Sequence, residues 1–263
     1  YLTFGAYAHL TRAHLKNVDD EKSEKNDAQK KKNQIFMEVV GVDVKRQSRE
    51  TNSRVAVDMG WENNCVFVEG TIAEAEVTFP TPRAEDGGNA SRNNPSSASV
   101  VDVVLALHAC DTATDEALVR AVKWRAPLTL VAPCCHHDLQ VRLKEHTKRA
   151  ENGVQTSHNG QGPLMKHGIL RERMGDVLTD AFRAHVMRLL GHRVDVTEWI
   201  GGEHTPRNTM IKAVRTGGGA SKQTWREYDA MVAEWGVTPR LAEMLRDELA
   251  EARAAAFAET TIV

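Results

Sequence analysis

Short apolar runs alternate with amphipathic stretches along most of this chain of 263 residues. Four runs have the length of buried β-strands, namely residues 35–44, 65–68, 100–107 and 128–132. The last two are almost continuously apolar, which is typical of parallel strands buried on both faces of a sheet. Stretches with apolar residues at helical spacing lie at 45–61, 115–124 and 169–190.

Two of these helical stretches carry more detailed signals. The stretch over 115–124 follows Thr112-Ala113-Thr114-Asp115, which predicts a capping box at its start. The stretch over 169–190 has the clearest apolar stripe, formed by Leu170, Met174, Val177, Leu178, Phe182 and Leu189. We therefore expect this stretch to be a long helix that buries one face.

The second half of the chain predicts an antiparallel edge and a helical tail. Runs 193–200 and 209–214 have no helix-length gap between them, so they should pair as antiparallel strands. Together with the strand-helix alternation, this predicts a Rossmann-like, doubly wound α/β sheet with a terminal antiparallel strand. Residues 221–259 predict a helical tail with an apolar stripe of Trp225, Tyr228, Met231, Trp235, Leu241 and Leu245. We expect a sheet domain over 1–217 and a helical extension over 218–263.

Three polar segments interrupt this pattern and are interpreted as insertions, near residues 16–33, 80–99 and 151–162. The chain begins at Tyr1, not at Met, and residues 1–10 already have the pattern of the middle of a helix. We therefore expect that the sequence lacks its true amino end.

Composition narrows the class of protein. Lys and Arg number 34 and Asp and Glu 36, so the balance excludes a highly basic, histone-like protein, and any nucleic-acid contact must come from a local patch. No run approaches the ~20 apolar residues of a membrane span, and the start lacks the pattern of a signal peptide. Cysteines at 65, 110, 134 and 135 lack the spacing of a disulfide scaffold. We expect reduced thiols and an intracellular protein with no membrane partner, located in the cytoplasm or, as an open alternative, in an organelle.

Polar residues follow each predicted parallel strand, where ligands bind in such sheets. Asp43 ends the first run, and a carboxylate there accepts hydrogen bonds from a ribose diol or caps the next helix. The second run ends in Glu69-Gly70-Thr71-Ile72, from which an acid or hydroxyl reaches an adenine. The third ends in His108-Ala109-Cys110-Asp111, and the fourth in Pro133-Cys134-Cys135-His136-His137-Asp138.

These thiols and imidazoles are zinc-ligand types, but their spacing argues against a zinc site. Consecutive residues on a strand end point to opposite faces, so Cys134, Cys135, His136 and His137 cannot all converge on one ion. A site made of His108 or Cys110 with one Cys and one His stays open, as does a nucleophilic Cys-His pair. Buried thiols that pack as small apolar residues are the simplest alternative. We predict no metal site.

The combination of motifs resembles a family of class I S-adenosylmethionine-dependent methyltransferases. The resemblance rests on Gly41-Val42-Asp43-Val44-Lys45, on the segments 107–115 and 133–137, and on Glu203-His204-Thr205-Pro206-Arg207-Asn208. The His-x-Cys, Ala-Thr-Asp and Cys-Cys-His-His elements are also similar to those of tRNA 2′-O-methyltransferases that act on the acceptor stem. Two features depart from those enzymes: zinc-finger segments are lacking, and Asp138-Leu139 replaces an Arg-Cys pair.

The resemblance implies a role for each strand end. In such families a glycine-rich cofactor loop ends just before a helix start like Tyr1-Leu2-Thr3, so the first strand and this loop are expected to be missing and Tyr1 to border the cofactor. Asp43 is expected to bind the ribose, with Glu69, Gly70 and Thr71 beside the adenine. Leu107, His108 and Ala109 are expected beside the methionine moiety.

Methyl transfer to a ribose hydroxyl needs a base, and His108, Asp111 and His136 are the candidates. His204 is a further candidate, although His-Thr-Pro also shapes a turn.

The predicted function is S-adenosylmethionine-dependent methyl transfer, with RNA, including tRNA ribose 2′-hydroxyls, as the expected acceptor. Arginines on the 169–190 helix could contact phosphate, although a solvated helix face is the commoner meaning of Arg171, Arg173, Arg183 and Arg188. A protein or small-molecule methyltransferase, a non-catalytic scaffold whose tail docks a partner, and a dinucleotide-dependent oxidoreductase are the alternatives. DNA is not an expected partner, and the oligomeric state stays open.

Overall fold

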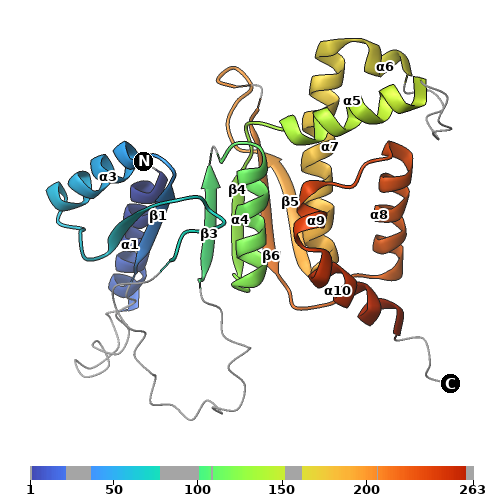
Figure 1. The fold of residues 1–263 in the computed structure, drawn as a ribbon. Coiled ribbons are helices and arrows are strands. Elements are labelled where there is room, and N and C mark those ends of the chain that lie inside the picture. Colours follow the sequence, from blue (N-terminus) through green and yellow to red (C-terminus); the bar gives the residue numbers. More distant parts are fainter. Residues whose placement is uncertain are drawn as a thin grey trace. The chain divides into compact units, whose positions relative to one another are not determined.

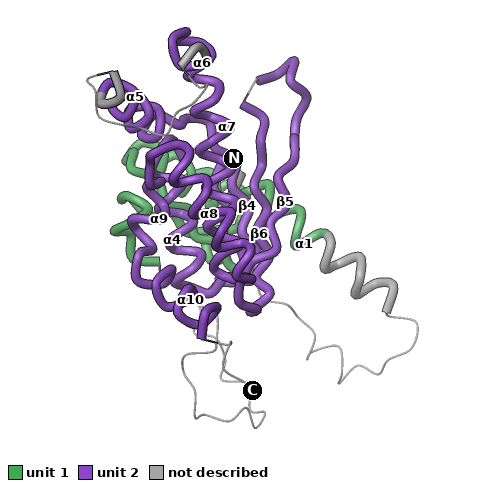
Figure 2. Tube along the Cα trace, turned by 90° about the vertical axis from the view of Figure 1, so that its right-hand side faces the viewer, with its two compact units in different colours: residues 1–92 green, residues 93–263 purple. Residues whose placement is uncertain are grey.

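The computed structural model describes residues 2–21, 37–77, 101–107, 109–151, 162–205 and 207–258. The chain divides into two compact units, residues 1–92 and 93–263 (Figure 2). Each unit has its own sheet and its own hydrophobic core.

The first unit pairs two parallel strands with two helices. Its elements are α1 (Leu2–Glu21), β1 (Val39–Asp43), α3 (Arg46–Asp58) and β2 (Cys65–Glu69). The strands run parallel, with Val39 opposite Cys65 and Asp43 opposite Glu69. Phe4 of α1 packs on Phe67 of β2, with ring centroids 5.3 Å apart. The predicted helical pattern near the start is therefore confirmed, and α1 continues through residues 16–21 of the first proposed insertion.

The sheet of the second unit has the order β3-β4-β6-β5 (Figure 1). Its strands are β3 (Val103–Leu107), β4 (Leu128–Ala132), β5 (His192–Glu198) and β6 (Thr209–Arg215). Strands β3 and β4 are parallel, whereas β6 runs antiparallel to both of its neighbours. The predicted antiparallel pair is confirmed, and β4 has the predicted bounds. The mixed α/β arrangement is compatible with a Rossmann-like fold.

Seven helices of the second unit are described: α4 (Thr112–Lys123), α5 (His137–Glu151), α6 (Gly162–Lys166), α7 (Gly168–Leu189), α8 (Lys222–Trp235), α9 (Arg240–Met244) and α10 (Arg246–Ala258). Helix α4 packs on β3 and β4, and α7 packs on β5 and β6. A tight turn joins α7 to β5, and Gly191 has a φ of 79° there, which a residue without a Cβ adopts without strain.

The predicted apolar stripe of the tail belongs to the core of the second unit. Trp225, Leu241 and Leu245 are almost completely buried, in one cluster with Phe182 of α7 and Ile211 of β6. Burial of these side chains removes apolar surface from water, which stabilises the folded unit. The stripe therefore packs against its own unit and is not the exposed docking surface that the scaffold hypothesis requires.

The capping box predicted for α4 and two positions of the apolar stripe predicted for α7 are wrong. The capping box does not form at Thr112, because α4 begins at that residue and its N-cap is Asp111. Asp115 instead turns inward to a buried arginine. On α7, Val177 and Leu170 of the predicted stripe are exposed, since the buried face follows Leu178, Phe182 and Leu189.

Other predictions fall outside the described residues. The proposed insertion at 80–99 lies there entirely, and most of those at 16–33 and 151–162 do as well. Among the described residues, none of the helices combines the length and apolar character that a membrane span requires.

Replacing Leu241 by alanine tests the place of the tail in the core. We expect Leu241→Ala to lower the free energy of unfolding by about 2–5 kcal/mol, because truncation leaves a cavity among residues that cannot fully collapse. Val177→Ala is the matched control, since Val177 is 67% exposed, and it should change stability by less than about 0.5 kcal/mol. Urea unfolding measures both. Equal effects of the two variants would contradict the packing of the tail.

Helix α9 is also held by ion pairs that should respond to pH. Arg142 of α5 binds both carboxylate oxygens of Glu243, at 2.6 and 3.0 Å, and its Nε lies 2.7 Å from Asp138. The hydrogen bonds from Arg142 hold the pKa of Glu243 below its ordinary value. A carboxylate of this kind stabilises the fold above its unfolded pKa, and this contribution is lost as the pH falls through the folded pKa.

We therefore expect Glu243→Gln to be about 1 kcal/mol less stable than the parent at pH 7, given that both partners are partly exposed. This difference should vanish in acid, below the lowered pKa of Glu243. Urea unfolding from pH 7 to pH 3 measures it, with exposed Glu251→Gln of α10 as the control. A difference that is as large at pH 3 as at pH 7 would show that the ion pair does not carry it.

Candidate functional site

The carboxyl ends of β1 and β2 place two acidic residues side by side in the first unit. Asp43 and Glu69 are partners in the parallel register, and the Gly70 amide donates to the Asp43 carbonyl at 3.0 Å. Asp43 Oδ1 accepts a hydrogen bond from the Lys45 amide at 2.8 Å, yet the residue is exposed. The carboxylate therefore faces solvent and accepts a hydrogen bond in the turn before α3. The alternative that Asp43 caps this helix is wrong, because the N-cap of α3 is Lys45.

The other described residues of the predicted cofactor site lie at the last position of a strand or in the turn that follows it. The Thr71 hydroxyl donates to the Glu74 carboxylate at 3.0 Å and accepts from the Glu74 amide at 3.2 Å. Leu107 is the last residue of β3, and the Ala109 carbonyl accepts from the Thr114 hydroxyl. Each residue therefore lies at a strand end, as predicted.

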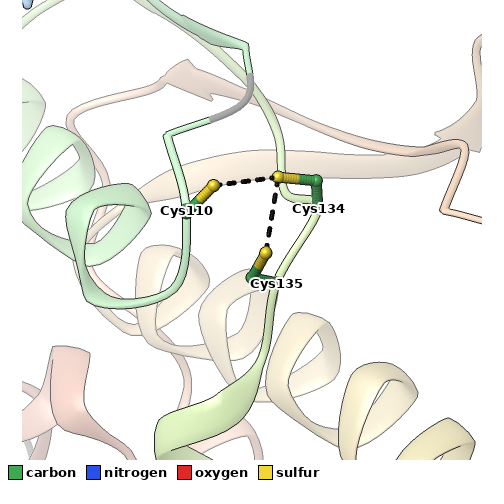
Figure 3. Close-up of side chains that lie close together, drawn as sticks. All are labelled: Cys110, Cys134 and Cys135. Atoms are coloured by element: carbon green, nitrogen blue, oxygen red, sulfur yellow. Dashed lines mark hydrogen bonds between the residues drawn. The ribbon is translucent and has the colours of Figure 1, made fainter.

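The second unit brings three thiols together, which we name the thiol cluster: Cys110, Cys134 and Cys135. The Cys110 and Cys134 sulfurs are 3.4 Å apart, and those of Cys134 and Cys135 are 3.7 Å apart (Figure 3). Cys110 follows β3, and the other two follow β4. The prediction that adjacent residues there point to opposite faces is wrong for Cys134 and Cys135. Alternation applies within a strand, and β4 ends at Ala132.

Burial favours the protonated form of Cys134 and Cys135. It raises the pKa of Cys134 to about 12, and the contacts with Cys110 and Cys135 raise it further. Burial also raises the pKa of Cys135. Because the thiolate is the nucleophile, this environment disfavours the Cys-His nucleophile hypothesis.

Asp111 connects the two turns that carry the thiol cluster. Its carboxylate accepts a hydrogen bond from the Asp138 amide in the first turn of α5, at 3.0 Å. Such an acceptor satisfies an amide that has no partner within the helix, and its charge suits the helix N-terminus. The backbone of Asp111 has a φ of 51° and a ψ of −121°, a sparsely populated conformation that costs about 1–3 kcal/mol.

Arg183 of α7 stabilises this strained turn through hydrogen bonds. Its guanidinium donates to both carboxylate oxygens of Asp115, at 2.8 and 3.1 Å, and to the Asp111 carbonyl, at 2.8 Å. Asp180, one turn earlier on α7, lies 3.4 Å away. Arg183 is only 1% exposed. Burial raises the pKa of Asp115, and the paired arginine opposes this rise.

His136, in the turn after β4, lies between two carboxylates of α7. Its Nε2 is 2.9 Å from Asp180, and its Nδ1 is 3.2 Å from Asp176. Burial alone lowers the pKa of His136, but these carboxylates outweigh it and raise the pKa. The imidazole is 3% exposed, so it holds the turn against α7 and does not face a substrate.

Arg207 extends this network to the loop before β6. It binds Asp176 at 3.2 Å and Glu172 at 2.8 Å, both on α7. Its charge also acts on the Cys135 thiol, whose pKa it lowers against the dominant effect of burial. Arg207 therefore acts on Cys135 from a position that two carboxylates of α7 hold.

The remaining predicted residues include some that lie outside the described residues, some that are exposed and one that is buried. Tyr1 and His108 lie outside the described residues, and His204 is exposed in a turn between β5 and β6. Of the four arginines considered for phosphate contacts, Arg183 is buried in ion pairs and cannot bind a phosphate, whereas Arg173 and Arg188 are exposed.

Sequence reasoning missed Asp176 and Asp180 of α7, and it considered Arg183 only as a phosphate contact or as part of a solvated face, not as a buried ion-pair residue. A signal was present, because the three are spaced by four and three residues on a helix whose neighbours Thr179 and Phe182 are buried. Charged residues in register with a buried stripe require partners, and His136 and Asp115 are these partners.

Comparison with known proteins gives one match, to a family model. Residues 23–142 match the family model of a methyltransferase domain. The match spans just under half of the chain and includes Asp43, Glu69 and the whole thiol cluster, whereas α7 lies beyond it. It supports a methyltransferase activity. No curated protein and no solved structure matches the chain.

Arg183 is expected to be the most sensitive ion-pair position of the second unit. Arg183→Gln leaves Asp115 and Asp180 buried without their cation, so it should cost about 3–5 kcal/mol of stability. Arg173→Gln, on the exposed face of the same helix, is the matched control and should cost less than about 0.5 kcal/mol. Urea unfolding followed by circular dichroism compares them. Parent-like stability of Arg183→Gln would refute the role of the network.

Proposed function

We propose that the chain is an S-adenosylmethionine-dependent methyltransferase. The observation that carries this proposal is the match to a methyltransferase domain, which includes the polar ends of β1, β2, β3 and β4. The donor set fits the cofactor, because an exposed carboxylate at a strand end suits a ribose diol. The alternative of a dinucleotide-dependent oxidoreductase has no comparable support.

Within this proposal Asp43 binds the ribose hydroxyls, and Glu69, Gly70 and Thr71 border the adenine. Leu107, His108 and Ala109 lie beside the methionine moiety. S-Adenosylmethionine supplies a methyl group on a positively charged sulfur. The contribution of the protein is to orient the acceptor for in-line attack, and a fixed turn serves that purpose.

The assignment of the catalytic base narrows to His108 and Asp111. His108 lies outside the described residues, whereas Asp111, in the turn after β3, is partly exposed. His136 is enclosed by Asp176 and Asp180, so we assign it a positioning role. An acceptor hydroxyl with a pKa far above neutrality requires such a base, whereas a more acidic acceptor does not.

For the acceptor we propose RNA, and specifically the ribose 2′-hydroxyl of tRNA. The support is the similarity of the His-x-Cys, Ala-Thr-Asp and Cys-Cys-His-His elements to those of the tRNA enzymes. Exposed Arg173 and Arg188 are the phosphate contacts that remain available on α7.

Calorimetric titration with S-adenosylmethionine tests the cofactor. Asp43→Asn keeps an acceptor for the Lys45 amide but removes the charge, so we expect binding to weaken about tenfold or more without loss of fold. Exposed Asp58→Asn at the end of α3 is the matched control. A folded parent protein that does not bind would refute the proposal.

Transfer of a labelled methyl group identifies the acceptor. Purified tRNA, total protein and a small-molecule extract are offered separately to the parent protein. The proposal expects label in tRNA that alkali-resistant dinucleotides locate at a ribose. Label only in protein or in small molecules would retain methyl transfer and reject the RNA assignment.

A further inference from the structure

The thiol cluster has the dimensions of one face of a tetrahedral metal site. Tetrahedral zinc with Zn–S bonds of about 2.3 Å places its sulfur ligands about 3.8 Å apart. The sulfur of Cys134 is 3.4 Å from that of Cys110 and 3.7 Å from that of Cys135, and all three sulfurs lie within 4.8 Å of one another. Figure 3 shows the three side chains directed toward a common point from two separate turns.

Other parts of the structure hold these turns in place, so the cluster does not need a metal to assemble. Asp111 joins the first turn to the α5 amide of Asp138, and Arg183 holds the Asp111 carbonyl. His136, next to Cys135, is fixed by two carboxylates of α7. A preformed set of ligands lowers the ordering cost of binding.

The chemistry of the cluster also selects its ligand. Three thiolates are soft donors, which favour zinc or monovalent copper over magnesium or calcium. Binding of a divalent ion to three thiolates leaves one net negative charge, and Arg207 places a cation within electrostatic range of Cys135. Cys110 is exposed while its two partners are partly buried, so one side of the cluster opens to solvent.

We propose that Cys110, Cys134 and Cys135 bind one Zn²⁺, with the fourth coordination position open on the exposed side of Cys110. The ion replaces the thiol protons and joins the turn after β3 to the turn after β4. A disulfide uses two sulfurs and leaves the third unexplained, whereas a zinc ion uses all three. This inference does not depend on the proposed methyl transfer, since metal binding is measured without a methyl donor.

Metal titration of the full chain tests the inference. The protein is reduced, its thiols are counted, and metal is removed with a chelator before Zn²⁺ is added in competition with a chromophoric chelator. Co²⁺ is used in parallel, because tetrahedral thiolate coordination gives it characteristic visible and charge-transfer bands. We expect one ion per chain, thiolate-type bands and a higher unfolding temperature with Zn²⁺.

Serine variants locate the site. Cys134→Ser removes the sulfur that contacts both others, and we expect it to weaken Zn²⁺ binding at least tenfold and to abolish the cobalt bands. Cys110→Ser, at an exposed position, should do the same with little effect on folding. Cys65→Ser is the matched control, since Cys65 is a buried thiol of the first unit. Circular dichroism checks that each variant is folded.

Three results would overturn the inference. The first is a reduced, folded parent protein that binds neither Zn²⁺ nor Co²⁺. The second is unchanged stoichiometry and affinity in folded Cys110→Ser. The third is loss of binding in Cys65→Ser but not in the cluster variants, which would place the metal elsewhere.

Discussion

The buried guanidinium of Arg183 is the interaction on which the rest of the site depends. It binds the Asp115 carboxylate through two oxygens and the carbonyl of Asp111, so it ties α7 to the start of α4. Asp180 shares that cation and also holds His136, which fixes the turn after β4. A charge buried to this degree is stable only with such partners. One arginine thus sets the geometry of two strand ends.

This constraint has a chemical consequence. Asp111 keeps an unfavourable backbone conformation because Arg183 and the α5 amide of Asp138 hold it, and Cys110 precedes it directly. The same framework brings Cys134 and Cys135 toward Cys110 from β4. Methyl transfer depends on accurate placement of donor and acceptor, and a fixed turn is suited to that task. His136 contributes by holding the framework, which explains its burial.

The sequence predicted the elements better than the contacts. Apolar runs located β4 at its observed bounds and the β5–β6 pair, because short strands that are buried in a sheet are rich in apolar residues. The capping box failed because Asp115 satisfies a buried cation from a helix that is distant in sequence. The strand-end residues Asp43 and Glu69 followed from topology, whereas the convergence of Cys134 and Cys135 depends on an irregular turn that no period describes.

Hydrogen exchange with and without S-adenosylhomocysteine tests most directly the proposal that the cofactor binds at the carboxyl ends of β1 and β3. The account predicts slower exchange of backbone amides in residues 41–45, at the carboxyl end of β1, and in residues 109–112, after β3, with α10 unchanged. Because exchange reports each amide separately, the result does not depend on turnover or on the acceptor. Bound ligand with unchanged exchange in both segments, or with protection confined to α10, would contradict it.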